Sequence, residues 1–295
     1  MKSSLEKYGC VLENIDIKDH STFKVSALID YLVLPNNIED LKELIRYLKK
    51  ENIKYKMIGK CSNLIFVNEH YEGVLIRLDF LNHFEIKNDF IISGSGVSLM
   101  KLAIDASSSC LTGLEWATGI PGSVGGAIVQ NAGAYGKNME SIVKSITVLT
   151  EAGNIEVWEK EKIGFSYRHS YLKDHPEIIC LEATLKLEKG NSKEIMESIK
   201  TKREKRFATQ PLDYPSCGSV FRNPEGEVVA GKLIEDAGLK GLKIGGAEVS
   251  KKHANFIINT GGATGSDIKK LVLFIQEKIK EKYKIDLILE QEFVE

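Results

Sequence analysis

The chain has 295 residues, 43% of them hydrophobic and 27% charged, and its 40 basic and 41 acidic residues leave a formal net charge of -1. This composition is typical of a globular protein of about two domains, and it gives no overall field that would attract nucleic acid or an anionic membrane. No run approaches the ~18 apolar residues of a membrane-spanning helix, and residues 1–20 lack the apolar core of a secretion signal. We therefore expect a cytoplasmic protein without nucleic-acid, membrane or obligate protein partners.

The cysteines are odd in number and contain no Cys-x-x-Cys pair; they are Cys10, Cys61, Cys110, Cys180 and Cys217. This pattern predicts neither a disulfide framework nor a zinc site, and it fits a reducing compartment. The six histidines do not assemble into a metal-binding pattern either.

The first third of the chain alternates between strand and helix patterns. A strand is predicted over residues 29–34, and a helix capped by Asn37 follows it. A second strand over residues 55–58 runs directly into Gly59. This alternation indicates α/β or α+β architecture.

The middle of the chain opens with a strand over residues 74–78 and a hairpin that turns at Asn88-Asp89 and returns over residues 90–92. Ser98 is expected to cap a helix. Strands dominate from the glycine-rich residues 113–136 to about Leu187.

The last third begins with a helix near Ser192, predicted to be amphipathic, that carries the basic residues 200–206. These charges suit either a solvated helix face or the local attraction of a phosphorylated substrate. A Pro-containing segment over residues 210–223 leads to a final helix and a final strand over residues 285–294. The apolar stripe of that helix consists of Ile268, Leu271, Val272, Ile275 and Ile279.

Three glycine-containing segments follow predicted strands. Residues 119–127 hold four glycines and one proline, and residues 59–63 and 94–96 repeat the theme. Glycine lets backbone amides approach a ligand without a Cβ clash, and such amides can form a nest for a diphosphate. We expect the three loops to converge on one extended, doubly phosphorylated ligand, although residues 94–96 alone also suit a plain tight turn. Neither a P-loop nor the Gly-x-Gly-x-x-Gly of a Rossmann domain occurs.

Six stretches occur in an order that matches one known family. They are Gly59-Lys-Cys-Ser-Asn-Leu64, residues 113–127, Gln130-Asn-Ala-Gly-Ala-Tyr-Gly136, Tyr167-Arg-His-Ser170, residues 210–224 with their Cys-Gly-Ser-Val-Phe, and Leu233-Ile-Glu-Asp-Ala-Gly-Leu-Lys-Gly241. Over most of its length the sequence thus resembles the UDP-N-acetylenolpyruvoylglucosamine reductase (UDP-N-acetylmuramate dehydrogenase) family.

The resemblance implies an α+β fold with a vanillyl-alcohol-oxidase-type FAD-binding part. Its two subdomains would span residues 1–77 and 78–190. A substrate-binding domain would span residues 191–295, with its last strand returning to the active site. Bound FAD, NADPH as the hydride donor and a UDP-sugar substrate are implied, with NADPH and substrate using one cleft in turn. The implied reaction reduces the enolpyruvyl ether of UDP-N-acetylglucosamine enolpyruvate to UDP-N-acetylmuramate, in peptidoglycan precursor synthesis.

The FAD contacts that the resemblance implies lie in the three glycine loops. They are Gly59, Lys60, Cys61, Ser62, Asn63, Leu64, Gly94, Gly96, Gly119, Ile120, Pro121, Gly122, Ser123, Gly125, Gly126 and Ala127. Cys61 is a departure, because the family usually has glycine there; we expect a local shift of the loop rather than loss of binding.

Some family members insert a tyrosine-bearing loop after the strand that corresponds to Thr184–Leu187. Here only a few residues separate Leu187 from the next helix. The chain resembles the shorter form, for which a more open substrate cleft is expected.

Reduction of an enolpyruvyl ether needs a hydride at one alkene carbon, a proton at its neighbour, and stabilisation of the enolate between them. By resemblance, Arg168 stabilises the enolate with its permanently charged fork, and Ser219 donates the proton. Glu290 assists the enolate, and Glu292 also follows a plausible pattern. A Gly-x-Ser-x-Gly elbow is absent, which argues against a hydrolase.

Four further residues are expected to contact the substrate or orient it: Asn131, Tyr167, Asn223 and His253. A plain turn or capping role is the alternative for the two asparagines. A lone histidine is also more often structural than catalytic.

Two other functions remain possible for such a fold. One is an oxidase that passes electrons to oxygen, which would lack the Tyr-Arg-x-Ser and Cys-Gly-Ser-Val-Phe stretches. The other is a flavin-binding sensor without turnover, in which Arg168, Ser219 and the terminal glutamate would be dispensable.

Overall fold

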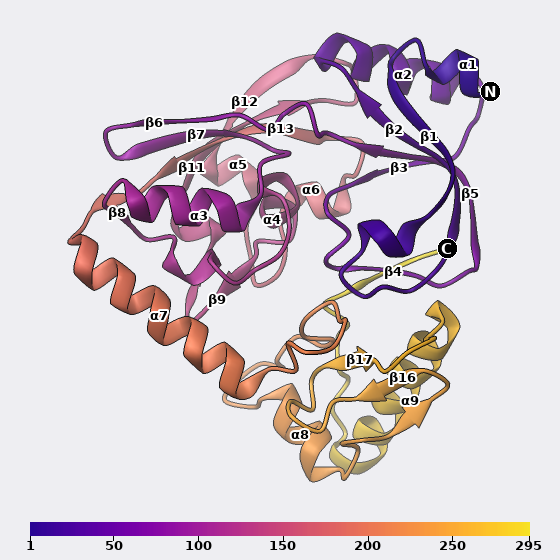
Figure 1. The fold of residues 1–295 in the computed structure, drawn as a ribbon, viewed down its shortest axis with the longest axis vertical. Helices are drawn as coiled ribbons and strands as arrows, with labels where there is room; N and C mark the ends of the chain where they lie inside the picture. The colour runs from indigo at the N-terminus through magenta and orange to yellow at the C-terminus, as the bar shows by residue number, and fades with distance from the viewer. The chain divides into compact units, whose positions relative to one another are not determined.

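The computed structural model describes residues 1–295, which form two compact units (Figure 1). Unit 1 consists of residues 1–13, 31–60 and 73–204, and unit 2 of residues 14–30, 61–72 and 205–295. Both units are therefore assembled from segments far apart in sequence. The expected division into residues 1–77, 78–190 and 191–295 stays a prediction.

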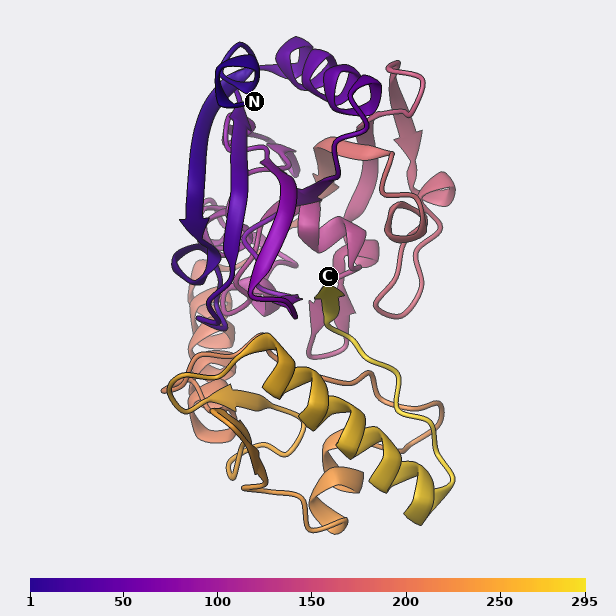
Figure 2. The ribbon, with the colours of Figure 1, turned by 90° about the vertical axis from the view of Figure 1, so that its right-hand side faces the viewer.

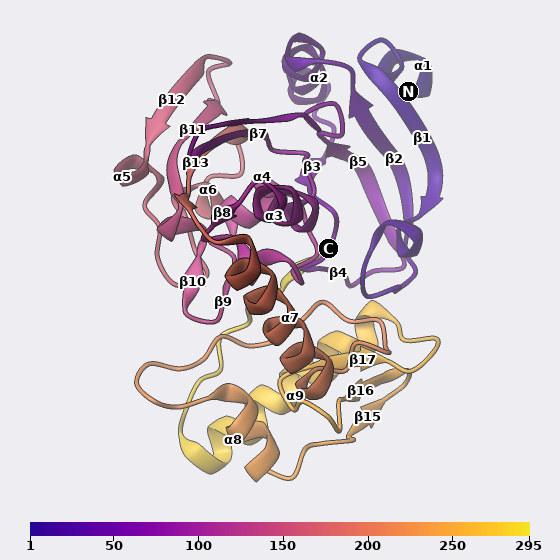
Figure 3. The same ribbon diagram turned by 60° about the vertical axis from the view of Figure 1, so that its left-hand side comes forward.

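A five-stranded antiparallel sheet forms one half of unit 1. Its order is β12 (Ile155–Glu159), β11 (Val143–Leu149), β13 (Ile179–Lys186), β7 (Phe90–Gly94) and β6 (Phe84–Lys87). Helix α4 (Val124–Val129) packs against β13 and β7, and α3 (Leu99–Ser108) lies next to α4 (Figures 1 and 3). The predicted hairpin is confirmed, with Asn88 in the left-handed region at φ 58°.

The second sheet of the chain has the order β1 (Gly9–Asp16), β2 (Leu28–Pro35), β5 (His70–Arg77) and β3 (Tyr55–Ile58). Helix α2 (Ile38–Lys50) buries Leu41, Leu44 and Leu48 in one hydrophobic core of unit 1. The Asn37 side chain accepts a hydrogen bond from the Asp40 amide at 2.9 Å, which confirms the predicted cap.

Unit 2 is built around a small antiparallel sheet of β15 (Lys243–Ile244), β16 (Ala247–Val249) and β17 (Ile257–Asn259). The long helix α9 (Gly265–Tyr283) lies along this sheet, as Figure 2 shows. Its five predicted apolar residues are all buried in one core together with α8 (Ala230–Asp236). Strand β18 (Glu292–Val294) pairs in parallel with β4 (Leu64–Phe66).

Two expectations about the last third were wrong in detail. A helix α7 (Ser192–Thr209) forms where predicted, but Ile195 is its single buried residue, so it has no apolar stripe. The final strand covers only Glu292–Val294 instead of residues 285–294. The preceding residues make isolated contacts instead, such as the single bridge between Leu289 and Phe221.

Ser98 precedes α3 as predicted, but its side chain forms no capping hydrogen bond. The first amide of α3, at Leu99, instead donates to the Gly122 carbonyl at 3.1 Å. The helix start is thus bonded to the glycine-rich loop.

The remaining elements are short. They are α1 (Lys2–Leu5), β8 (Leu111–Thr112), β9 (Gly133–Ala134), β10 (Lys137–Asn138), α5 (Lys160–Ile163), α6 (Tyr171–Asp174) and β14 (Glu188–Lys189), with 3₁₀ turns at Ile17–His20, Glu115–Ala117 and Met139–Ser141. None of the helices combines the length and the apolar composition that crossing a bilayer requires.

Candidate active site

The glycine loops of unit 1 meet in space. A Cβ on Gly59 would lie 2.9 Å from the Ser123 Oγ, so the loop after β3 touches the loop before α4. The Gly125 amide donates to the Ser95 carbonyl at 2.9 Å, which joins the loop after β7 to the same place. Residues 59–60, 94–96 and 119–127 are therefore brought together, although residues 119–127 follow the 3₁₀ turn Glu115–Ala117 rather than a strand.

The glycines in these loops serve different purposes. A Cβ on Gly94 or Gly96 would lie 2.5 Å from the Leu81 carbonyl oxygen or 2.2 Å from that of Leu78, so packing alone requires glycine at both positions. Gly122 adopts a φ of 143°, which side chains rarely tolerate. A Cβ on Gly126, by contrast, would approach nothing closer than the Ser123 Oγ at 3.4 Å.

Ser95 is the residue in this cluster that sequence reasoning missed. Its side chain is 4% exposed, and its buried Oγ has no hydrogen-bond partner. A buried hydroxyl in that state calls for a ligand or a water molecule. The signal was its place between two glycines directly after β7. Such a donor beside a glycine cradle fits the diphosphate portion of FAD.

The predicted loop of residues 59–64 is divided between the two units. Gly59 and Lys60 belong to unit 1, and Cys61, Ser62, Asn63 and Leu64 belong to unit 2. Cys61 is buried and has a φ of 47°, in the left-handed region that favours glycine. The backbone geometry thus explains why a related loop would carry glycine here.

Arg168 lies in unit 1 beside β9. Its Nη2 donates to the Gly133 carbonyl at 2.8 Å, and its guanidinium lies 5.3 Å from the centre of the Tyr167 ring. Its φ of 58° is unusual for a side-chain-bearing residue. Backbone strain of this kind is concentrated at functional sites.

Asn131 links the backbone of Glu140 to that of Ser166 through its side chain. The side chain is 1% exposed; its Nδ2 donates to the Ser166 carbonyl at 2.8 Å, and its Oδ1 accepts the Glu140 amide at 3.0 Å. Through these hydrogen bonds the side-chain amide of Asn131 holds the backbone near Tyr167 and Arg168. The geometry favours a structural role for Asn131 over a direct contact with substrate.

Ser219 and Glu290 both lie in unit 2, and the backbone brings them together. Ser219 follows Gly218, whose φ is 76°, and forms an isolated bridge with Phe256. The Glu290 amide donates to the Val220 carbonyl at 2.8 Å. Glu292 instead pairs through its amide with the Asn63 carbonyl, at 2.9 Å. Glu290 is therefore the glutamate whose backbone bonds to the residue after Ser219.

Asn223 and His253 both make local bonds in unit 2. The Asn223 Oδ1 accepts the Ala230 amide at 3.1 Å, at the start of α8. The His253 Nδ1 accepts the Asn255 amide at 3.3 Å, and its ring meets that of Phe256 edge-on. Burial lowers the pKa of His253, so the imidazole is neutral at physiological pH.

Acidification is expected to destabilise the fold through His253. Its folded pKa lies below the ordinary value of 6.5, so the unfolded chain binds more protons as the pH falls. The stability it contributes is fully present above that value and is lost as the pH falls toward the folded pKa. Urea unfolding at about pH 7.5 and about pH 5.5 should show a smaller pH dependence for His253→Gln than for the unaltered chain. His83→Gln, an exposed control, should retain the full dependence.

Arg222 is a second residue that sequence reasoning missed. Its Nε is buried and has no hydrogen-bond partner, although its backbone amide donates to the Ile288 carbonyl at 2.9 Å. A guanidinium with an unpaired buried N–H can fork onto phosphate or carboxylate oxygens. The signal was its place three residues after Ser219 in the Val-Phe-Arg-Asn stretch.

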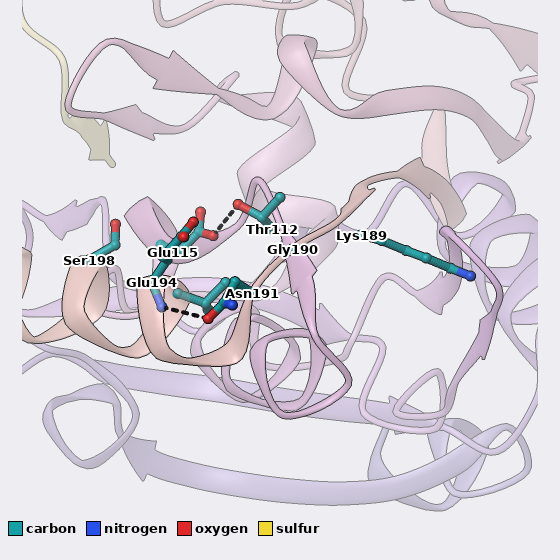
Figure 4. A pocket seen from close by; sticks show the side chains of 8 residues that line it. Thr112, Glu115, Lys189, Gly190, Asn191, Glu194 and Ser198 are labelled. Carbon is teal, nitrogen blue, oxygen red and sulfur yellow. Dashed lines mark hydrogen bonds between the residues drawn. The ribbon is translucent and has the colours of Figure 1, made fainter.

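A cavity of about 500 Å³ in unit 1 contains none of the predicted site residues. Its lining includes Thr112, Glu115, Asn191 and Glu194 (Figure 4). Glu115 accepts hydrogen bonds from the Thr112 hydroxyl at 2.6 Å and from the Gly113 amide at 3.0 Å. Because Glu115 is already paired and the cavity holds none of the predicted site residues, we assign it no role in the reaction.

Comparisons with known proteins agree with the site. Residues 29–158 match the family model of an FAD binding domain, and residues 210–294 match that of the UDP-N-acetylenolpyruvoylglucosamine reductase C-terminal domain. The chain is 44% identical to the UDP-N-acetylenolpyruvoylglucosamine reductase of Bacillus licheniformis, over 97% of this chain and 94% of that protein. The Bacillus subtilis reductase is 41% identical over the same shares. The crystal structure of the Thermus caldophilus reductase superposes with a TM-score of 0.81 at 32% identity, covering 95% of this chain and 98% of that one.

These matches confirm the predicted fold class, in which an FAD-binding part precedes a C-terminal α+β domain. The shorter form is confirmed as well, since only residues 190–191 separate β14 from α7. The cofactors are FAD, which the domain match supports directly, and NADPH as the reductant. The protein is accordingly an FAD-containing oxidoreductase. The chain belongs to the UDP-N-acetylenolpyruvoylglucosamine reductase family.

Proposed function

We propose that the chain reduces the enolpyruvyl ether of UDP-N-acetylglucosamine enolpyruvate to the lactyl ether of UDP-N-acetylmuramate, in peptidoglycan precursor synthesis. Membership of the family supports the reductase activity. The observation that carries the residue assignments is the backbone pairing of the Ser219 and Glu290 segments within one unit. The five free thiols suit the cytoplasm, which we propose as the place of reaction.

When bound, FAD in its reduced form supplies a hydride from N5 to one alkene carbon of the substrate. We assign its diphosphate to the glycine loops around Gly59, Gly122 and Gly126, with the Ser95 hydroxyl as an additional donor. These loops have the backbone freedom and the unpaired hydroxyl that such a ligand needs.

The residues of the chain stabilise the developing negative charge and supply the proton. After hydride arrival, negative charge moves onto the substrate carboxylate as an enolate. Arg168 and Glu290 are the proposed stabilising groups for that charge, because a preorganised cation and a hydrogen-bonding carboxyl act most strongly where charge develops. A carboxyl can help only while it is protonated or shares a proton.

Ser219 is the proposed proton donor to the neighbouring carbon. A serine hydroxyl is a weak acid, so it must be held at hydrogen-bonding distance from the carbanion. Its backbone bridge with Phe256, in the segment that also bonds to Glu290, supports this role. Arg222 and Tyr167 are the further residues that we assign to substrate binding, because the Arg222 Nε is buried without a hydrogen-bond partner and Tyr167 is exposed.

Anaerobic half-reactions test the proposed function. Purified protein should be yellow with bound flavin, and NADPH should bleach the flavin absorbance. Adding UDP-N-acetylglucosamine enolpyruvate without oxygen should then restore the absorbance. Restoration only by air would indicate an oxidase, and protein that stays colourless with added FAD would refute the FAD assignment.

A further inference from the structure

We propose that Gln291 is a positioning residue that fixes the proton-donor loop against the segment that contains the proposed catalytic glutamate. The proposal rests on the roles proposed above for Ser219 and Glu290. Gln291 lies directly after Glu290, and its side chain is 4% exposed. No feature of the sequence pattern singled it out.

The amide of Gln291 reaches the loop that carries Ser219. Its Nε2 donates to the Cys217 carbonyl at 3.1 Å and to the Gly218 carbonyl at 3.3 Å. Two carbonyl acceptors around one atom identify that atom as the NH₂ group, since an amide oxygen there would face both with no hydrogen to offer. The side chain thus bonds to the two residues immediately before Ser219.

The backbone on both sides of Gln291 is also tied down. The Glu290 amide donates to the Val220 carbonyl at 2.8 Å, and the Glu290 carbonyl accepts from the Asn63 Nδ2 at 3.1 Å. Residues on both sides of Ser219 are therefore bonded to the segment that contains Glu290. Gln291 supplies the bonds on the N-terminal side, and the backbone supplies those on the C-terminal side.

The loop needs such a support because it contains Gly218 in the left-handed region. Glycine has more conformational freedom than any other residue, so the orientation of the following Ser219 is weakly fixed by the chain itself. Proton transfer requires the hydroxyl to be placed closely, and a misplacement of ~1 Å can slow a reaction ~100-fold. Two hydrogen bonds at Cys217 and Gly218 restrict that freedom at the point where it matters.

The Oε1 of Gln291 is buried without a partner. A buried polar atom without a bond destabilises the fold, so this oxygen offsets part of what the two donated bonds contribute to stability. The better-supported effect of the amide is that it links the Cys217 and Gly218 carbonyls to the segment that contains Glu290.

The test compares Gln291→Met with Gln276→Met. Methionine keeps the length of the side chain and cannot donate a hydrogen bond. Gln276 is a matched control on α9, because its Nε2 also donates to a carbonyl of unit 2, that of Leu287, at 2.8 Å. Each holoenzyme is reduced by NADPH under anaerobic conditions and then mixed with UDP-N-acetylglucosamine enolpyruvate.

Gln291→Met should reduce the limiting rate of reoxidation by about 10- to 100-fold. Its half-saturating substrate concentration and its reduction by NADPH should change little, and Gln276→Met should behave as the unaltered protein. Hydrogen exchange of backbone amides in residues 216–220 should become faster in Gln291→Met only. This second readout does not depend on turnover.

Normal reoxidation and normal exchange in Gln291→Met would overturn the proposal, as would an equal loss in both half-reactions. Ser219→Ala, measured in parallel, distinguishes failure of the proton-donor role from failure of the positioning role. If Ser219→Ala reoxidises normally, the proton-donor role fails; if it is slow while Gln291→Met is normal, only the positioning role fails. Should Gln291→Met not accumulate as folded protein, Gln291→Leu replaces it, since it is uncharged, apolar and unable to donate a hydrogen bond.

Discussion

Replacing Ser219 by alanine is expected to leave reduction of the flavin by NADPH near normal and to slow its reoxidation by the UDP-sugar about 10²- to 10⁴-fold. That range is the usual contribution of a positioned general acid. The two half-reactions separate because only the second one needs a proton at the substrate carbon. Stopped-flow absorbance of the flavin, recorded anaerobically, measures both rates on one preparation.

Ser216→Ala is the matched control, because it makes the same chemical change three residues earlier in the same segment. It should leave both half-reactions near normal. Ser219→Ala removes one oxygen atom, and thermal unfolding should confirm that the variant is folded at the assay temperature. An equal slowing of both half-reactions would contradict the assignment of Ser219 as the proton donor.

Local patterns predicted the elements that depend on short-range forces. Asn37 caps its helix, Asn88 sits at a hairpin turn, and the apolar stripe from Ile268 to Ile279 is buried. Each of these features follows from residues a few positions apart, where side-chain periodicity and turn chemistry act directly. Where such a pattern was weak, as in the charged α7 and the segment before β18, the prediction was wrong in detail.

The assembly of the two units could not be predicted from local patterns. Residues 14–30 and 61–72 join residues 205–295, although they lie within the first quarter of the chain. One contact of this kind is the bond from the Asn259 side chain to the Phe23 carbonyl, at 3.2 Å. Pairings at such separations depend on the packing of the whole core, which periodicity in a short window does not report.

The candidate site shows the same division. Convergence of residues 59–60 and 94–96 could be expected, because each of these loops follows a strand, whereas residues 119–127 follow the 3₁₀ turn Glu115–Ala117. Ser95, Arg222 and Gln291 were missed because their interest lies in a buried polar atom without a partner. Whether a polar atom is buried and whether it has a hydrogen-bond partner depend on the fold, so neither can be predicted from the residue type. Asn131 and Asn223 were selected by motif, yet their side chains bond to backbone amides.

Replacing Arg168 by lysine is expected to slow reoxidation by the UDP-sugar about 10²- to 10³-fold, the range found when one preorganised donor to a developing oxyanion is lost. The Arg168 Nη2 donates to the Gly133 carbonyl at 2.8 Å, which orients the guanidinium, and a guanidinium fork matches the two oxygens of a carboxylate. A lysine ammonium is a single point of charge and cannot form both the fork and the bond to Gly133.

The lysine variant tests the guanidinium fork without changing the backbone conformation at position 168. Arg168 has a φ of 58°, and lysine carries the same Cβ and unbranched stem, so the strain of that conformation is equal in both proteins. Arg46→Lys, on the exposed face of α2, makes the same change where Arg46 pairs only with Glu43, and it should leave reoxidation unaltered. Anaerobic stopped-flow measurement of the limiting rate of flavin reoxidation tests this prediction. If the two lysine variants reoxidise at the same rate, the guanidinium fork is not required at position 168, and the prediction fails.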